Sequence, residues 1–112
     1  MILHFLNPVL AAIAPAVPAS EVGAVASYYA DKYEGQVMAN GKPFHQAVLT
    51  CASNNWPLGT KLRVRFGDLV VVVRVTDRMA AGNNRIDLSK AAFKRLSPLT
   101  PGIITVGVTI AQ

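Results

Sequence analysis

Two aspartates are the strongest candidates for chemistry in this chain, Asp77 and Asp87. A carboxyl group can donate or accept a proton during catalysis, and an acid catalyst needs a raised pKa. Arginines at positions 74, 78 and 85 would lower the pKa of a nearby carboxyl. Two interpretations of Asp77 are therefore open: an acid and base catalyst, or a carboxylate that pairs with an arginine and only fixes loops.

The other reactive side chains favour no second kind of chemistry. The single Cys51 cannot form an internal disulfide, and its apolar surroundings favour a small buried residue over a nucleophile. The two histidines, His4 and His45, are too few and too far apart to indicate a metal site. Neither a glycine loop for phosphate nor a Ser-His-Asp order is present, so we expect no metal and no cofactor.

A predicted hairpin leads to Asp77. Residues 61–66 alternate strictly between basic and apolar, which is typical of a half-buried strand. Gly67-Asp68 makes a tight turn, and the apolar run 69–76 predicts a central strand buried on both faces. This strand ends at Asp77.

Three further strands and one helix complete the predicted elements. The strands are expected at 24–30, 47–52 and 103–110. Ser89 is a good N-cap for a helix over 89–96, which Pro98 ends. The helix residues expected to face inward are Leu88, Ala92, Phe93 and Leu96. Short strands around one helix predict an all-β barrel, since closing the sheet removes edges that a small domain could not cover.

Composition supports one domain with a separate leader. The chain has 112 residues, is 52% apolar, and carries a formal charge of +5, which favours a neutral or acidic partner. Residues 1–19 contain no Asp, Glu, Lys or Arg and end in Val17-Pro18-Ala19, typical of a signal peptide. We therefore expect an exported, periplasmic or secreted protein, with residues 20–112 forming the domain.

Several motifs in order resemble a known family. They are ASYYA, MANGKPF, AVLTCAS, PLGTKLRV, VVVRVTDR and NRIDLSKAAF. Across residues 24–110 the chain resembles the double-psi β-barrel domain of the rare lipoprotein A (RlpA) family. Expansins and barwin-like proteins share this barrel. The resemblance implies a small six-stranded double-psi β-barrel with one short helix.

The family activity that the resemblance implies is lytic transglycosylation of peptidoglycan. The bond from N-acetylmuramic acid to N-acetylglucosamine is cleaved without water, which leaves a 1,6-anhydro sugar. One carboxyl can protonate the glycosidic oxygen and later take the proton from the sugar's 6-hydroxyl. Asp77 matches the family's aspartate. Asp87 matches an aspartate that resembles the acid or glycan contact of expansins, although helix capping is a simpler explanation for it.

Two positions depart from the family pattern. Lys42 stands where the family usually has Glu, and Ser53 stands where His is expected. If those groups are essential, the protein is a poor or inactive transglycosylase. His45 falls where an acidic residue often occurs and could carry a proton, or it could be a hydrogen-bonded surface residue.

Binding candidates are aromatic and basic residues. Tyr28, Tyr29 and Trp56 could stack on sugars, although alternation places one tyrosine in the core. Lys61, Arg63 and Arg65 form a basic strand face that could meet stem-peptide carboxylates or simply face solvent. The predicted substrate-binding set is Tyr29, Lys42, Ser53, Trp56 and Arg78.

Three functions are consistent with these features: a lytic transglycosylase, an expansin-like module that binds or loosens glycan without cutting it, and a secreted barrel with a protein partner. Lys42 and Ser53 favour the second. The expected partner is the glycan strand of peptidoglycan. We expect no nucleic acid, because basic residues are not interleaved with aromatics. We expect a monomer without a membrane anchor.

Overall fold

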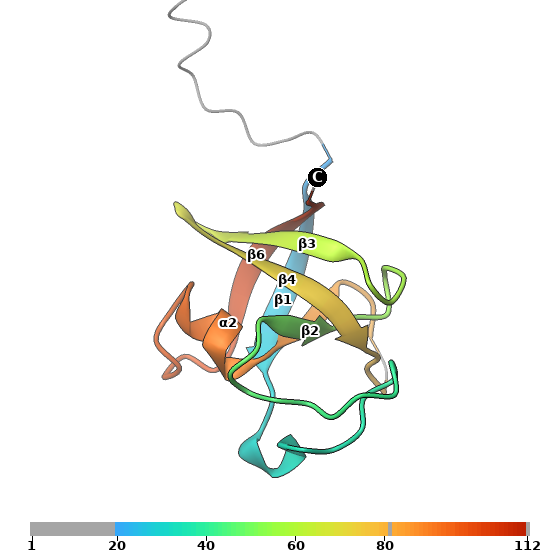
Figure 1. The fold of residues 1–112 in the computed structure, drawn as a ribbon. Coiled ribbons are helices and arrows are strands. Elements are labelled where there is room, and N and C mark those ends of the chain that lie inside the picture. The colour runs from blue at the N-terminus through green and yellow to red at the C-terminus, as the bar shows by residue number, and fades with distance from the viewer. Residues whose placement is uncertain (1–19, 81, 112) are drawn as a thin grey trace, which may run out of the picture.

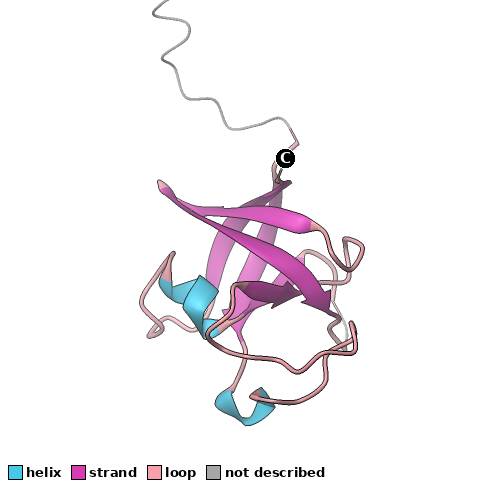
Figure 2. Ribbon diagram, in the orientation of Figure 1, coloured by secondary structure: helices cyan, strands magenta, loops and turns pink. Residues whose placement is uncertain are grey.

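The computed structural model describes residues 20–80 and 82–111, so the predicted leader lies outside the described residues. Six strands form a closed barrel with the order β1-β5-β2-β4-β3-β6 (Figures 1 and 2). The strands are β1 Val22–Tyr28, β2 Thr50–Ala52, β3 Lys61–Phe66, β4 Leu69–Asp77, β5 Arg85–Leu88 and β6 Ile104–Ile110. A short α-helix, α2 (Lys90–Lys94), and a 3-10 turn, η2 (Asp31–Tyr33), accompany them. The predicted fold class is confirmed.

The barrel mixes parallel and antiparallel pairs. β1 runs parallel to β5, and β2 runs parallel to β4, whereas the other neighbouring pairs are antiparallel. Because β2 lies between β4 and β5, it brings together two segments that carry the candidate aspartates. The long loop after β1 crosses the lower end of the barrel in the view of Figure 1.

The β3–β4 hairpin matches its predicted bounds within one residue, but one prediction about β4 is wrong. We expected this strand to be buried on both faces. Val71, Val73 and Val75 point into the barrel, whereas Val72 is 44% exposed and Arg74 is also exposed. A closed barrel has one interior, so the side chains on the other face of this strand point outward and are exposed. The β-branched residues therefore reflect strand propensity and a single buried face.

The helix and the shorter strands follow the sequence with shifted bounds. Ser89 is the N-cap of α2, and its hydroxyl accepts a hydrogen bond from the backbone N–H of Ala92 at 3.2 Å. The four residues predicted to face inward are buried. The strand expected over 47–52 is shorter, at Thr50–Ala52, because residues 47–49 belong to the crossing loop. No helix in the described part of the chain has the length and apolar character needed to cross a bilayer.

Cys51 is a core residue, as predicted. Its side chain is fully buried in the main hydrophobic cluster, and burial raises the pKa of the thiol to about 12. The thiol therefore stays protonated at neutral pH, and it contributes packing rather than nucleophilic chemistry.

Candidate active site

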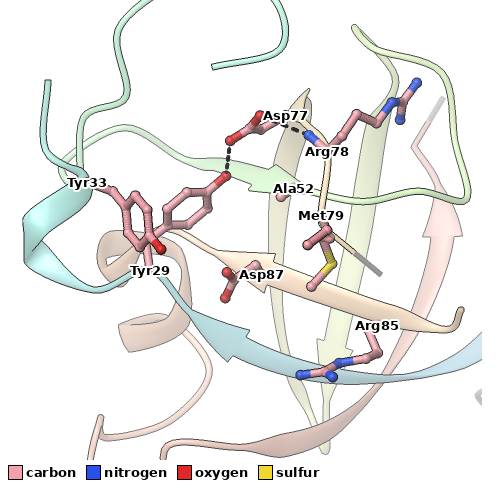
Figure 3. Close-up of a pocket in the computed structure, with 9 residues that line it drawn as sticks. Tyr29, Tyr33, Ala52, Asp77, Arg78, Met79, Arg85 and Asp87 are labelled. Atoms are coloured by element: carbon pink, nitrogen blue, oxygen red, sulfur yellow. Dashed lines mark hydrogen bonds between the residues drawn. The ribbon is translucent and has the colours of Figure 1, made fainter. Parts of the chain in front are cut away.

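A cleft of about 430 Å³ opens where β4 ends and β5 passes (Figure 3). Nine residues line it: Tyr29, Tyr33, Ala52, Asp77, Arg78, Met79, Ala80, Arg85 and Asp87. Both candidate aspartates are among them. The cleft therefore combines two carboxyl groups with two tyrosines and two arginines.

Ala52 sets the spacing of the two aspartates. In the parallel pairing of β2 with β4 it is the partner of Asp77, and in the antiparallel pairing with β5 it is the partner of Asp87. Neighbouring strands lie about 4.8 Å apart, so the two aspartate backbones are separated by about 10 Å. On β2, the side chain at the position between them is the methyl group of Ala52. This leaves room for a ligand between the carboxyl groups.

Asp77 is held by three hydrogen-bond donors. Its Oδ2 accepts from the Tyr29 hydroxyl at 2.6 Å, and its Oδ1 accepts from the backbone N–H groups of Ala39 and Arg78, both at 2.9 Å. None of the ion pairs formed by the described residues includes Asp77. Neutral donors, and not the arginine partner considered from the sequence, therefore fix its orientation.

Arg78 lines the cleft but turns its charged end away from the aspartates (Figure 3). Its Nη1 donates to the backbone carbonyls of Ser53 and Trp56, at 2.7 and 2.6 Å. The guanidinium thus braces the loop after β2. Within the described structure, only its backbone N–H bonds to Asp77.

Tyr29 is a buried donor to Asp77. Its side chain is only 6% exposed, and its ring stacks on Phe44 with centroids 4.0 Å apart. Burial raises the pKa of the Tyr29 hydroxyl, and the hydrogen bond to the Asp77 carboxylate raises it further. The hydroxyl therefore remains protonated and donates to Asp77. Tyr33 packs edge-on against the Tyr29 ring at the mouth of the cleft.

Asp87 has a different environment from Asp77. Its Oδ1 accepts one hydrogen bond, from the Ser27 hydroxyl at 2.9 Å. Burial raises the pKa of Asp87, while Ser27 and the charge of Arg85 act in the opposite direction. The simpler explanation offered by the sequence, helix capping, does not describe this residue, because Ser89 caps α2 and Asp87 bonds to β1.

Three predicted binding residues do not reach this cleft. Lys42 lines a separate cavity on the outside of the barrel. Ser53 is fully buried, and its hydroxyl accepts from the backbone N–H of Asn55 at 3.0 Å. Trp56 is half-buried against the main core and lines a third cavity. Of the predicted binding set, the structure brings only Tyr29 and Arg78 to the aspartates.

The remaining polar candidates lie outside the cleft. His45 is exposed, with its Nδ1 2.7 Å from a carboxylate oxygen of Glu34. On the basic strand face, Arg65 makes two hydrogen bonds to Glu21, whereas Lys61 and Arg63 are exposed. Part of the charge of this face is therefore already neutralised within the domain.

Sequence reasoning missed several residues of the cleft. Tyr33 and Met79 line it, and Ser27 supports Asp87. Tyr33 is an aromatic residue in a polar turn, and this could have indicated a sugar-binding residue. The N–H of Ala39 was not detectable, because a backbone donor leaves no mark in the sequence.

Comparison with known proteins decides the family. A family model described as lytic transglycolase matches residues 21–108, nearly the whole barrel. The chain belongs to this family. The resemblance stated from the motifs is thereby confirmed.

Among relatives in the lytic transglycolase family, a protein of Synechocystis sp. named "Probable endolytic peptidoglycan transglycosylase RlpA" is 37% identical over 94 residues. The match covers 80% of this chain but 29% of the relative. The chain therefore spans less than a third of that relative's length.

Solved structures share the barrel of this family. The Streptomyces papain inhibitor has a TM-score of 0.68 and 26% identity, over 87% of this chain and 100% of the inhibitor. A mutant Clavibacter michiganensis expansin in complex with cellohexaose has a TM-score of 0.65 and 20% identity, over 82% of this chain and 50% of the expansin. At that identity the expansin shows a common fold and nothing more.

Proposed function

We propose that this barrel acts on cell-wall peptidoglycan as a lytic transglycosylase, cleaving the bond from N-acetylmuramic acid to N-acetylglucosamine to leave a 1,6-anhydro product. The unequal environment of the two cleft aspartates carries the proposal. Burial raises the pKa of Asp87, whereas three donors hold Asp77 as an acceptor. Two carboxyl groups in unequal surroundings suit separate acid and base roles at a glycosidic bond.

The proposed reaction assigns one proton transfer to each aspartate. Asp87 donates its proton to the glycosidic oxygen as the bond from that oxygen to C1 of the muramic sugar breaks. The sugar's own 6-hydroxyl oxygen then bonds to C1, and its proton passes to Asp77. No water is consumed, and exchange with solvent returns the proton to Asp87. This extends the sequence hypothesis, in which Asp77 served as both acid and base.

Tyr29 and the surrounding groups would prepare the cleft for this step. The Tyr29 hydroxyl and two backbone N–H groups hold Asp77 in one orientation, so little reorganisation is needed when it accepts a proton. Tyr33 is 39% exposed at the mouth and offers a ring face for a sugar.

Product analysis tests the proposal. The protein, Asp77→Asn and Asp87→Asn would each be incubated with purified peptidoglycan, and the soluble fragments analysed by mass spectrometry for the anhydro product. We expect product from the wild type and a loss of at least about 100-fold in either variant. Absence of product from the wild type across pH 4 to 8 would exclude lytic transglycosylase activity.

A non-catalytic, expansin-like function is the alternative, and the Lys42 and Ser53 positions favour it. Ser53 is buried and bonded to Asn55, so no side chain replaces the expected histidine in the cleft. In this case the protein would sediment with insoluble peptidoglycan, release no product, and detach when Lys61 and Arg63 are neutralised. Failure to sediment would exclude it.

A protein partner is a further alternative, favoured by the likeness to the Streptomyces papain inhibitor over that inhibitor's whole length. Inhibition of papain by this protein would support it. No inhibition at a tenfold molar excess of protein would leave no support for this function.

We also propose that the protein works outside the cytoplasm, because its proposed substrate is there, and that residues 1–19 are a cleaved leader before a domain of residues 20–112. The mass of the protein recovered from the producing bacterium tests this. Cleavage after Ala19 is expected, whereas an intact amino terminus on cytoplasmic protein would contradict it. Size-exclusion chromatography would test the expected monomer.

A further inference from the structure

Gln46 fastens the loop between β1 and β2 to the barrel through both ends of its side-chain amide. Its Nε2 donates to the backbone carbonyl of Tyr29 at 2.7 Å and to Oδ1 of Asp31 at 3.2 Å. Its Oε1 accepts from the backbone N–H of Lys90 at 2.8 Å. One side chain therefore bonds the loop to the residue that follows β1 and to the start of α2.

The backbone of Gln46 is held at the same place. Its carbonyl accepts from the backbone N–H of Ala91 at 3.1 Å, and its N–H donates to Oε1 of Glu34 at 2.9 Å. The first N–H groups of a helix have no partners within the helix. Gln46 supplies partners for two of those in α2, and Ser89 supplies a third. The position of Gln46 on the barrel is therefore fixed.

A narrow hairpin, residues 35–44, extends from this anchor to the cleft. A backbone hydrogen bond of 2.7 Å between its first and last residues closes its base. At its tip, the backbone N–H of Ala39 donates to Oδ1 of Asp77 at 2.9 Å. Because the base ends two residues before Gln46, the anchor determines where the tip meets Asp77.

Tyr29 is the second route from Gln46 to Asp77. Gln46 bonds the backbone carbonyl of Tyr29, whose hydroxyl donates to Oδ2 of Asp77 at 2.6 Å. The Tyr29 ring also stacks on Phe44, the last residue of the hairpin. Two of the three donors to Asp77, the Tyr29 hydroxyl and the Ala39 N–H, therefore belong to segments that Gln46 holds.

We propose that Gln46 is a positioning residue for the cleft, which holds Tyr29 and the 35–44 hairpin so that their donors meet Asp77 before a substrate binds. The inference rests on the proposed function, in which Asp77 accepts a proton. Gln46 is not among the residues that line the cleft, so it acts through Tyr29 and the hairpin. Groups held in place in this way need little reorganisation during the reaction.

Amide hydrogen exchange of the full chain, followed by NMR, tests the positioning without requiring activity. The variant is Gln46→Met, which keeps the length of the side chain and removes its donor and acceptor. The matched control is Gln36→Met, because Gln36 is an exposed glutamine of the same loop whose side chain donates to the carbonyl of Lys32. The amides compared are that of Ala39 and those of β3 in the barrel wall.

We expect exchange at Ala39 to become about tenfold faster or more in Gln46→Met, because three side-chain hydrogen bonds are lost. Exchange in β3, and exchange at Ala39 in the Gln36→Met control, should stay within about twofold of the wild type. An equal rise at Ala39 and in β3 would show a general loss of stability. An unchanged rate at Ala39 would show that the hairpin is held without Gln46, and either result would overturn the proposal.

Kinetics tests whether the positioning serves the proposed reaction. In Gln46→Met, kcat for release of the anhydro product should fall about tenfold, with KM within about twofold. In a Tyr29→Phe background the same substitution should lower kcat less than about threefold, because both changes weaken one donor to Asp77. Fully additive losses would contradict a role that acts through Tyr29.

The two measurements separate this inference from the proposed function. Faster exchange at Ala39 in Gln46→Met, without anhydro product from the wild type, would support the positioning of Asp77 and overturn the transglycosylase. Product from the wild type, with an unchanged kcat in folded Gln46→Met, would support the transglycosylase and overturn the role of Gln46.

Discussion

Asp77 and Asp87 face one cleft from strands that lie on either side of Ala52, which pairs with both of them. The two carboxyl groups have unequal surroundings because β4 ends among backbone donors while the side chain of Asp87 is partly buried beside β1. The two carboxyl groups are therefore suited to different roles. The first three predictions follow from this difference.

The charge of Arg85 is expected to set the upper pH limit of activity. This charge lowers the pKa of Asp87 and opposes the effect of burial. Arg85→Gln removes it, so the pKa of Asp87 rises and the protonated acid persists to higher pH. The basic limb of kcat/KM against pH should move to higher pH, and it should stay in place in Lys94→Gln. A limb that moves to lower pH, or not at all, would show that Asp87 is not the acid.

Asp87→Asn is expected to stabilise the fold at neutral pH while removing activity. Burial raises the pKa of Asp87 above its unfolded value, so its contribution is fully present below the unfolded pKa of about 3.9 and is lost as pH rises through the folded pKa. Asparagine carries no charge, so its burial avoids the free-energy cost of desolvating a carboxylate. Its amide oxygen can still accept the hydrogen bond from the Ser27 hydroxyl. Its Tm should exceed that of the wild type at pH 7, by about 4–8 °C for each kcal/mol gained.

The same Tm advantage should shrink toward pH 3.5, where the wild-type carboxyl is protonated. Thermal unfolding followed by circular dichroism at both pH values measures this difference. If the variant is destabilised equally at pH 7 and pH 3.5, the charge of Asp87 is stabilised by its surroundings in the folded protein.

Tyr29→Phe is expected to lower kcat with little change in KM. The substitution removes the 2.6 Å hydrogen bond to Asp77 but keeps the ring that stacks on Phe44. A hydrogen bond to a charged group contributes about 1.5–3 kcal/mol, so the rate of anhydro-product release should fall about 10- to 100-fold. Tyr28→Phe is the control, because its hydroxyl bonds to the carbonyl of Leu99 and not to the cleft. A similar fall in both variants would point to a general loss of packing.

The sequence predicts those parts of the fold that depend on local pattern. Strict alternation gave the bounds of β3, and the hydroxyl of Ser89 marked the start of α2. The burial of β4 was predicted incorrectly because an apolar run does not reveal which side of a barrel wall faces water.

The site was only partly predictable for a related reason. Motifs indicated Asp77 and Asp87, but the path of the loop after β1 depends on long-range bonds such as that from the N–H of Ala39 to Asp77. This path places Lys42 beside another cavity. Such contacts are set by the closed barrel and not by the residues near them in sequence.

Gly107→Ala is expected to destabilise the barrel through a contact far from the cleft. A Cβ at this position would collide with the carboxyl group of Glu21, which accepts two hydrogen bonds from Arg65. The carboxyl group can move aside only by giving up its hydrogen bonds to Arg65, so we expect a loss of about 1 kcal/mol, which urea denaturation can measure.

Gly23 is the matched control, because it pairs directly with Gly107 across β1 and β6 and a Cβ there would meet no atom within 4 Å. Gly23→Ala should therefore leave the free energy of unfolding within about 0.5 kcal/mol of the wild type, or raise it slightly by restricting the unfolded chain. Equal destabilisation by the two substitutions would mean that the strand pairing, and not the position of Glu21, requires glycine. A loss confined to Gly107→Ala would show that this glycine makes room for the ion pair that joins the start of β1 to β3.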